Sequence, residues 1–489
     1  MRRFGLFGAV LLVLAVVYVA AWRVQPSRTS ARPSSPPTAA VTAVTRSCPP
    51  PAPHAGQAHI ALMSMPSGSA AVKSATGTVA LTAVPAVPAA PSTGKQAAAA
   101  PPVTVSTPGA LVTVTAPAAA GLGGTAVAAT GPMAAGFEAE QLDASGTGVV
   151  ACTHPGSDMW FVGTGTDDGA PQVRLYLMNT GDLPASVNVA ILTDAGLQSG
   201  LNTGITVAPH QFAAENIAPL VHGSVALALH VQTSSGQVAA AAWESGSSGG
   251  AWLPQAAGPA TRLVIPGLTV ASSAARLFLT VPGSTDARVK VVAFTAQGKF
   301  PQFGSVPVDA PASATSSFPL TSLGASAAGL QLTSTVPIVA GVLIPGQGIG
   351  SFTTAVAPVT EQGVVAGNPA ARGLTVGLVL TAPTAAARAS IAVIGVGAGS
   401  GPATVGGQQV TTVKAGHTLA VTVPRPPGRQ PFAVVITPLA GSGPIYAARV
   451  VTTGAGGLSA PVASLLPVPS ALTVITLSPA RNSYSAVLP

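Results

Sequence analysis

From Val173 onward, the chain repeatedly alternates apolar residues with small or polar ones over short runs. Such an alternation places every second side chain on one face of a β-strand. Four runs recur in the same order in three copies, with a period of roughly 100 residues, which indicates an internal repeat. The runs of the three copies begin at Val173, Arg276 and Thr375, then at Ala185, Ala287 and Ala387, then at Ile205, Ser305 and Thr411, and last at Val225, Gly329 and Phe432.

The order of these runs predicts the strands of each copy. The third run is interrupted by Pro or Gly, and the last one is interpreted as a hairpin, with the turn signal Ser-Ser-Gly at Ser234 in the first copy. We therefore expect each copy to be a small antiparallel β-sandwich of immunoglobulin-like shape with about seven strands. Similar runs between His59 and Phe161 predict either an earlier, divergent sandwich or strands that complete the first clear one.

The predicted fold class is all-β, with tandem immunoglobulin-like antiparallel β-sandwich domains after one N-terminal transmembrane helix. Composition agrees with strands joined by turns, because 55 Gly and 47 Pro residues disfavour helices, and Val and Thr suit a pleated sheet. The expected parts are a transmembrane signal anchor over 1–25, a Pro/Ser/Thr/Ala-rich tether over 26–58, a divergent β region over 59–161, and three β-sandwich repeats over 162–265, 266–370 and 371–489.

The stretch from Phe4 to Trp22 carries no charged residue and is almost wholly apolar. A helix of this length rises far enough to cross about 30 Å of hydrocarbon. An uncleaved anchor is favoured, because Tyr18 and Trp22 suit a membrane interface. The alternative is a cleaved signal peptide, with the small residues Val19 and Ala21 before a cut at Trp22.

Two features favour an extracytoplasmic location for the rest of the chain. The segment from Pro26 to about Ala58 has the composition of an extended tether. The two cysteines of the chain, Cys48 and Cys152, would close a loop of roughly 100 residues if they paired, and such a bond persists only in an oxidising compartment. Two buried free thiols and a metal site are the alternatives, although the cysteines and scattered histidines show no metal-ligand spacing.

Charged residues are few and unevenly distributed. They make up 7% of the chain, and the net charge is +8. The two ends, up to Phe137 and from Gln362, contain bases and no acids, whereas the middle is mildly acidic. A solvated surface is the expected reason, with weak attraction to anionic lipid or wall polymer as the alternative. No run of Lys or Arg with interleaved aromatic residues occurs, so we expect no nucleic-acid partner.

The motifs of common enzyme chemistries are missing from the sequence. The seven histidines form no HExxH arrangement, and no Gly-x-Ser-x-Gly elbow precedes a helical pattern. The glycine clusters at Gly346 and Gly395 lack the lysine and the strand-to-helix context of a phosphate-binding loop. We therefore predict no catalytic residue, no cofactor and no metal site.

Carboxylates beside tryptophans form one candidate binding site. An aromatic surface flanked by carboxylates can hold a sugar, and an aspartate cluster can hold Ca²⁺ through oxygen ligands. The alternative is that Trp160 and Trp243 fill a sandwich core and that the aspartates belong to a turn. Trp252, in a Gly/Ser-rich stretch, is expected on an exposed loop. The candidate ligand-binding residues are Asp158, Trp160, Trp243, Glu244 and Trp252, with Asp167 and Asp168 as further members of the aspartate cluster.

The stretch VVACTHPGSDMWFVGTGTDDG, followed by VRLYLMNTGD and later by GGAWLP and RLVIPGL, resembles a family of actinobacterial exported proteins, domain of unknown function 5719. The Cys-Pro-Pro-Pro at Cys48 matches an earlier Cys-Pro-x-Pro of that family. The resemblance spans most of the chain after the predicted tether, and the cysteine-containing stretch with Trp-Phe-x-Gly is its most specific part. It implies a cell-envelope location and a pairing of Cys48 with Cys152, and it implies no activity.

The sequence therefore predicts a non-catalytic protein of the cell envelope, a membrane-tethered array of β-sandwich domains that serves as a scaffold or as an interaction or adhesion module. We expect a single-pass membrane protein with its bulk outside the cytoplasm, or a secreted one if the N-terminal segment is cleaved. The expected partners are the membrane, through the N-terminal helix, and envelope glycans or envelope proteins. The alternative is a glycan-binding or glycan-processing envelope protein that uses exposed tryptophan and nearby carboxylates.

Overall fold

The chain divides into two compact units, Ala40–Thr473 and, separately, Met1–Ala39 with Val474–Pro489. Strands β1 (Thr38–Ala40) and β37 (Val474–Thr476) form a two-stranded sheet. The computed structural model describes residues 15, 18, 38–53, 56–65, 77–86, 108–116, 123–145, 147–166, 172–198, 204–246, 249–269, 275–304, 306–320, 327–346, 349–396, 403–404, 408–428 and 430–476.

The predicted anchor from Phe4 to Trp22 lies outside the described residues, except for Ala15 and Tyr18. Within the described part of the chain, no helix is long and apolar enough to cross a membrane. The predicted tether is wrong in its last part, because Ala43–Cys48 forms strand β2 and pairs with β6 (Gly124–Thr130). The last two residues of β2 are buried, so this segment packs against the protein although the sequence on both sides is rich in Pro.

Between Ala40 and Thr473, the described residues form antiparallel strands joined by turns, which confirms the predicted all-β class. Seven sheets occur in this unit, and the largest bends into two layers because β25 (Ala328–Ile344) pairs with different strands in its two halves. The described residues of this unit thus form eight layers. We number them so that consecutive numbers are layers that pack against each other. Layer 1 has β3 (Ala58–Met63), β5 (Leu111–Thr115), β7 (Glu138–Asp143) and β8 (Val149–Ala151), and layer 2 has β2, β4 (Val79–Val84) and β6.

The six other layers come from the repeated part of the chain. Layer 3 has β10 (Gln172–Asn179), β14 (Gln211–Asn216), β16 (Ala239–Gly246) and β17 (Gly249–Leu253). Layer 4 has β9 (Asp158–Gly163), β11 (Ala185–Thr193), β12 (Gly196–Gln198), β13 (Ile205–Val207), β15 (Leu227–Ser235) and β18 (Gln255–Ala256). Layer 5 has β20 (Arg276–Val281), β24 (Ala314–Pro319), the second half of β25 and β26 (Ser351–Thr354).

The last three layers are built mainly from the strands of the second and third copies. Layer 6 has β19 (Ala260–Leu268), β21 (Ala287–Thr295), β22 (Gly298–Pro301), β23 (Val308–Ala310) and the first half of β25. Layer 7 has β28 (Leu374–Ala382), β32 (His417–Thr422), β34 (Tyr446–Thr453) and β35 (Val462–Val468). Layer 8 has β27 (Gln362–Asn368), β29 (Ala387–Gly395), β30 (Ala403–Thr404), β31 (Gln409–Val413), β33 (Phe432–Pro438) and β36 (Ser470–Ala471).

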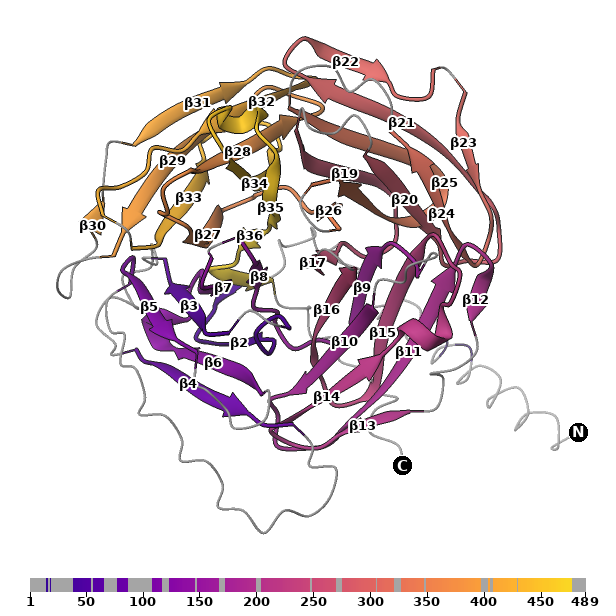
Figure 1. Ribbon diagram of the computed structural model, residues 1–489, viewed down its shortest axis with the longest axis horizontal. Helices are drawn as coiled ribbons and strands as arrows, with labels where there is room; N and C mark the ends of the chain where they lie inside the picture. Colours follow the sequence, from indigo (N-terminus) through magenta and orange to yellow (C-terminus); the bar gives the residue numbers. More distant parts are fainter. Residues whose placement is uncertain are drawn as a thin grey trace, which may run out of the picture. The chain divides into compact units, whose positions relative to one another are not determined.

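Each layer packs both of its faces against neighbouring layers, and these contacts close into a cycle (Figure 1). The apolar cores join layers 1 and 2, 2 and 3, 3 and 4, and so on to layers 7 and 8, and layer 8 packs back on layer 1. Sheets arranged in a cycle about a centre are the arrangement of a β-propeller. Hydrogen bonds link the layers as well, from Phe212 N to Pro85 O, from the Thr315 hydroxyl to Leu192 O, and from the Ala366 and Gly367 N–H groups to Glu140.

The four runs predicted in each copy are strands, but the last run is not a hairpin. Its two parts, β15 and β16 in the first copy, lie in layers 4 and 3 and pair with other strands. In the second copy the run is the single strand β25, which passes from layer 6 into layer 5 near Pro337. A strand without a reversal can cross between layers because adjacent layers pack face to face, about 10 Å apart.

Sandwich-like packing is therefore present, although the layers are not a string of separate sandwiches. A free-standing sandwich exposes its outer faces, whereas here each outer face is covered by the next layer. The predicted boundaries at 161/162 and 265/266 fall inside β9 and β19, which pair with strands of the repeat that follows. The immunoglobulin-like strand arrangement stays a prediction.

Candidate functional site

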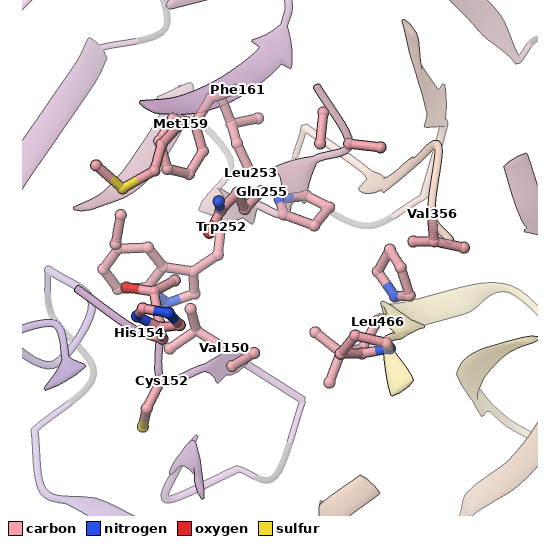
Figure 2. A pocket seen from close by; sticks show the side chains of 18 of the residues that line it. Val150, Cys152, His154, Met159, Phe161, Trp252, Leu253, Gln255, Val356 and Leu466 are labelled. Atoms are coloured by element: carbon pink, nitrogen blue, oxygen red, sulfur yellow. The ribbon is translucent and has the colours of Figure 1, made fainter. Parts of the chain in front are cut away.

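A pocket of about 460 Å³ lies where the end strands of several layers meet, and Figure 2 shows side chains that line it. We call it the central pocket. Its walls come mainly from β8, β9, β17, β18 and β35, from the segment between β8 and β9, and from the segment that follows β26. Arg46 of β2 adds to them, and all of these strands except β9 lie at one end of the strand order in their layer. Pairing and packing within the layers hold these end strands in place, so the pocket is built by the fold rather than by one loop. A concave site of this size is typical of small-molecule binding.

Apolar side chains form most of the pocket wall. Figure 2 shows Trp252 beside His154, with Val356 and Leu466 across the pocket from them. Trp252 lies in β17 and directly faces Trp243 of β16 in the sheet. The main apolar side chains of the wall are Val149, Val150, Met159, Phe161, Trp252, Leu253, Val356, Leu465 and Leu466.

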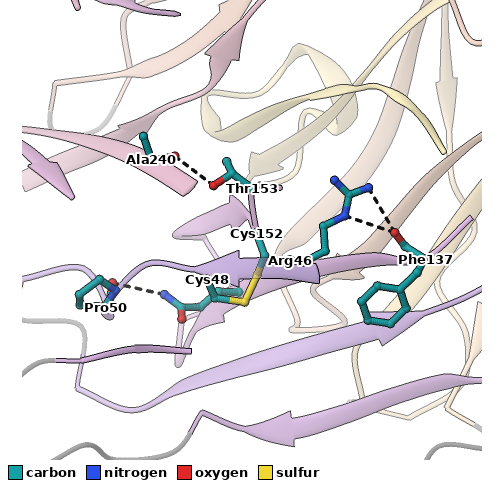
Figure 3. Close-up of a disulfide and its surroundings, with 8 residues drawn as sticks. Arg46, Cys48, Pro50, Phe137, Cys152, Thr153 and Ala240 are labelled. Atoms are coloured by element: carbon teal, nitrogen blue, oxygen red, sulfur yellow. Dashed lines mark hydrogen bonds between the residues drawn. A yellow bond between two sulfur atoms is a disulfide. The ribbon is translucent and has the colours of Figure 1, made fainter. Parts of the chain in front are cut away.

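One ion pair contributes charge to the pocket wall. Nη2 of Arg46 lies 2.5 Å from Oε1 of Glu138, and Nε and Nη2 of Arg46 also donate to the Phe137 carbonyl (Figure 3). Burial raises the pKa of Glu138 above its ordinary value, and the Arg46 charge and hydrogen bond partly oppose this rise. The pair lies mostly out of solvent, with 18% and 10% of the two side chains exposed.

A histidine and an aspartate complete the polar part of the wall. Burial, and then the nearby Arg46 charge, lower the pKa of the His154 imidazole. Asp158 is exposed, and its Oδ1 lies 3.3 Å from Nε2 of His230. Burial lowers the pKa of His230, while the hydrogen bond and the charge of Asp158 oppose this effect. Arg46 and Asp158 thus each have a partner of their own.

The predicted disulfide is present and forms part of the same wall (Figure 3). Cys48 ends β2 and Cys152 follows β8, so the bond joins layer 2 to layer 1, and Cys152 lines the pocket. Both cysteines are buried. Beside them, Ser47 and Thr153 exchange backbone hydrogen bonds, and the Thr153 hydroxyl donates to Ala240 O of layer 3.

Of the predicted ligand-binding residues that the structure describes, Trp252 and Asp158 line the pocket. Trp252 is in a strand and only 9% exposed, so the expectation of an exposed loop is wrong. The Gly/Ser-rich sequence around it did not form a loop, because Trp252 packs against Trp243 and Tyr176, with ring centroids 5.0 and 5.7 Å away.

The other predicted residues serve packing between layers. Trp160 is buried and stacks on His230, with ring centroids 3.8 Å apart. Trp243 is buried in the core between layers 2 and 3. Glu244 is fully buried, away from the pocket wall, and accepts a hydrogen bond from the Thr164 hydroxyl. The aspartates at 167 and 168 lie outside the described residues.

Sequence reasoning missed Arg46, Glu138 and His154. Arg46 fell inside the predicted tether, and His154 had no partner within a recognisable spacing. A signal for Glu138 did exist, because the sequence Glu-Ala-Glu of β7 places two acids on one face of a strand in a chain that has few acids. Buried acids at alternate positions need cations or N–H donors nearby, which here are Arg46 and the N–H groups of layer 8.

Comparison with known proteins gives a family but no activity. No curated protein matches the chain. A solved structure, that of Streptomyces avermitilis alpha-L-rhamnosidase complexed with L-rhamnose, is 10% identical with a TM-score of 0.11 and covers 86% of this chain. The chain covers 55% of the rhamnosidase chain, and a likeness this weak carries no argument. A family of unknown function, DUF5719, matches residues 103–424, more than half of the chain, and the chain therefore belongs to this family.

Proposed function

We propose that this chain is a non-catalytic protein of an actinobacterial-type cell envelope that serves as a scaffold or interaction module. The observation that supports this best is the closed cycle of layers. Because every layer is covered on both faces, partners meet only edge strands, loops and the central pocket, all held on a close-packed frame. Such a frame suits the presentation of binding surfaces at fixed positions.

The disulfide supports the extracytoplasmic location. A bond between Cys48 and Cys152 persists in oxidising compartments and is reduced in a bacterial cytoplasm. In the proposed topology, the segment from Phe4 to Trp22 holds the protein in the membrane, or is removed if the protein is secreted. The neighbours of the frame are then envelope glycans or envelope proteins.

Protease shaving of intact cells, followed by N-terminal sequencing of the cell-bound and released fragments, tests the location. We expect fragments from the Ala40–Thr473 unit to be released, and we expect mass spectrometry without reduction to recover Cys48 and Cys152 as one linked peptide pair. Full protection from protease in intact cells, together with free thiols at both cysteines, would refute the envelope location.

Site-specific photocrosslinking in cells tests the interaction role. A photoreactive amino acid at the exposed Leu197 is expected to give defined crosslinked species, whereas the same group at the buried Leu229 gives none. The absence of crosslinked species at Leu197, Leu183 and Val306, which are all exposed, would contradict a scaffold role. Turnover of envelope glycans by the purified chain would contradict the non-catalytic part of the proposal.

The alternative is a glycan-binding or glycan-processing role, which is favoured by one observation. Trp252 and Asp158, both predicted sugar contacts, line the same pocket. A glycan array with the full chain tests this role through Asp158→Asn. Asp182→Asn is the matched control, because Asp182 also pairs with a histidine, His210, but lies away from the pocket. Loss of a glycan signal in Asp158→Asn alone would favour the alternative, and equal signals in both variants would count against it.

A further inference from the structure

The chemistry of the pocket wall indicates which ligands the pocket can hold. Predominantly apolar side chains form most of the wall, and they include two aromatic rings, Phe161 and Trp252. Burying apolar ligand surface against such a wall contributes about 25 cal/mol per Å². A polar ligand surface would lose its hydration there without gaining equivalent hydrogen bonds.

The buried charges of the wall are already matched within the protein. Arg46 pairs with Glu138 across 2.5 Å, whereas the carboxylate of Asp158 is exposed to solvent and interacts with His230. His154 lies near Arg46, and its lowered pKa favours the neutral imidazole. An anionic ligand would have to compete with Glu138 for Arg46, and a cationic ligand would have to separate the same pair. A desolvated ion pair that loses one partner is costly, so the wall disfavours a ligand charge of either sign.

Hydrogen-bonding groups are scarce on the wall. The Thr153 hydroxyl already donates to Ala240 O, and Nε and Nη2 of Arg46 are occupied by Phe137 and Glu138. The imidazole of His154, the amide of Gln255 and the indole N–H of Trp252 remain for a few polar atoms of a ligand. A sugar carries several hydroxyl groups, more than these side chains can satisfy.

We infer that the central pocket binds one small, uncharged and predominantly apolar molecule, in contact with Phe161, Trp252 and Leu466. The volume of about 460 Å³ falls in the usual range for drug-sized ligands. Most of the wall comes from β-strands of several different layers, and the rest from the short segments beside them, so the site is formed before the ligand arrives and little ordering entropy is lost on binding. The inference does not depend on the proposed envelope role, because it concerns only the chemistry of the pocket.

The test uses a neutral alkyl diazirine as a photoreactive probe on the oxidised full chain in lipid nanodiscs. After irradiation, labelled peptides are mapped by mass spectrometry, which separates pocket labelling from probe dissolved in lipid. We expect saturable labelling of the peptides that contain Phe161, Trp252 and Leu466. Analogues of the probe with a carboxylate or an ammonium group are expected to label these peptides roughly tenfold less well at equal concentration.

Glycine substitutions provide a matched pair of variants. Gly156 lines the pocket and Gly283 does not, and a Cβ added at either position has no heavy atom within 4 Å. Gly156→Phe fills pocket space and is expected to weaken saturable labelling roughly tenfold, whereas Gly283→Phe leaves it unchanged. Ala357→Phe, at an exposed residue of the same wall, is the second filling variant if Gly156→Phe fails to fold.

Three results would overturn the inference. The first is non-saturable labelling of the pocket peptides, which would also be the outcome if another part of the chain fills the pocket. The second is equal or stronger labelling by a charged analogue. The third is labelling that survives both folded filling variants. None of these results changes the outcome of protease shaving, so failure of this inference is distinguishable from failure of the envelope proposal.

Discussion

Glu244 allows a quantitative test of how tightly layers 3 and 4 enclose a polar group. Its side chain is fully buried on β16, and the Thr164 hydroxyl donates to Oε2 at 2.9 Å. Among the described residues, Oε1 has no hydrogen-bond partner. Burial raises the pKa of Glu244 from 4.5 to about 8, and hydrogen bonds from Thr164 oppose this rise. The informative change is Glu244→Gln, because the glutamine amide resembles the protonated carboxyl and cannot ionise.

The sign of the effect follows from proton binding. In the unfolded chain Glu244 ionises near its ordinary pKa of 4.5, whereas in the folded chain it keeps its proton up to about pH 8. The folded state therefore binds more protons in this window, and the free energy of unfolding of the wild type falls as the pH rises from 4.5 to about 8. At 1.36 kcal/mol per pKa unit, the free energy of unfolding falls by about 5 kcal/mol. The Glu244→Gln variant lacks this pH-dependent loss of stability, because its side chain cannot ionise.

The assay is guanidinium unfolding of the oxidised full chain, followed by tryptophan fluorescence over a series of pH values. We expect wild type and Glu244→Gln to be equally stable near pH 4 and the variant to be more stable by up to about 5 kcal/mol near pH 9. Glu215→Gln, on the partly exposed strand β14, is the control and is expected to show no such trend. A stability difference that stays constant with pH, or that grows toward acid, would refute the reasoning.

Three further predictions concern the contacts that hold the layers together. Glu140 accepts hydrogen bonds from two N–H groups of layer 8, and Glu140→Gln leaves only one acceptor oxygen for them. We expect the free energy of unfolding, measured with denaturant at neutral pH, to fall by about 2 kcal/mol. An unchanged midpoint would contradict this. Replacing both Cys48 and Cys152 by Ser opens a link across 104 residues and is expected to cost about 4–5 kcal/mol, measured against reduced and oxidised wild type. In Gly329→Ala the new methyl group would lie 2.3 Å from a threonine hydroxyl of layer 7. We expect a lower melting temperature and a loss of about 1–3 kcal/mol in the free energy of unfolding. Gly283→Ala, where the added methyl group has open space, is the neutral control.

The strands could be predicted from the sequence to a large extent, but their partners could not. The alternation in the run at Ala185 became β11, and the run at Val173 became β10. Alternation shows that a face is buried and does not show which sheet covers it. The last run of each copy was therefore interpreted as a hairpin, because a turn signal at Ser234 looks the same whether the chain reverses within one sheet or passes to the next.

The pocket was less predictable than the strands, because it is assembled from residues far apart in the chain. Arg46 pairs with Glu138, 92 positions later, and Leu466 comes from the far end of the same unit. The tryptophans gave a partial signal. Residue type suggested a binding surface, but burial decides the role: among the described tryptophans, Trp252 lines the pocket, whereas Trp160 and Trp243 are buried away from it.

The low content of charged residues is also consistent with the arrangement of the layers. A sheet with one exposed face alternates apolar with charged residues, whereas a sheet covered on both faces has apolar or small residues at every position. Strand β28 is buried at seven successive positions, from Val376 to Ala382, and β34 is buried from Ala447 to Thr452. Small residues then allow close approach, as at Gly267, where an added Cβ would lie 2.7 Å from Ala448 of the next layer. A chain with 7% charged residues has few side chains for exposed sheet faces, and in the closed cycle each layer packs against a neighbour on both sides.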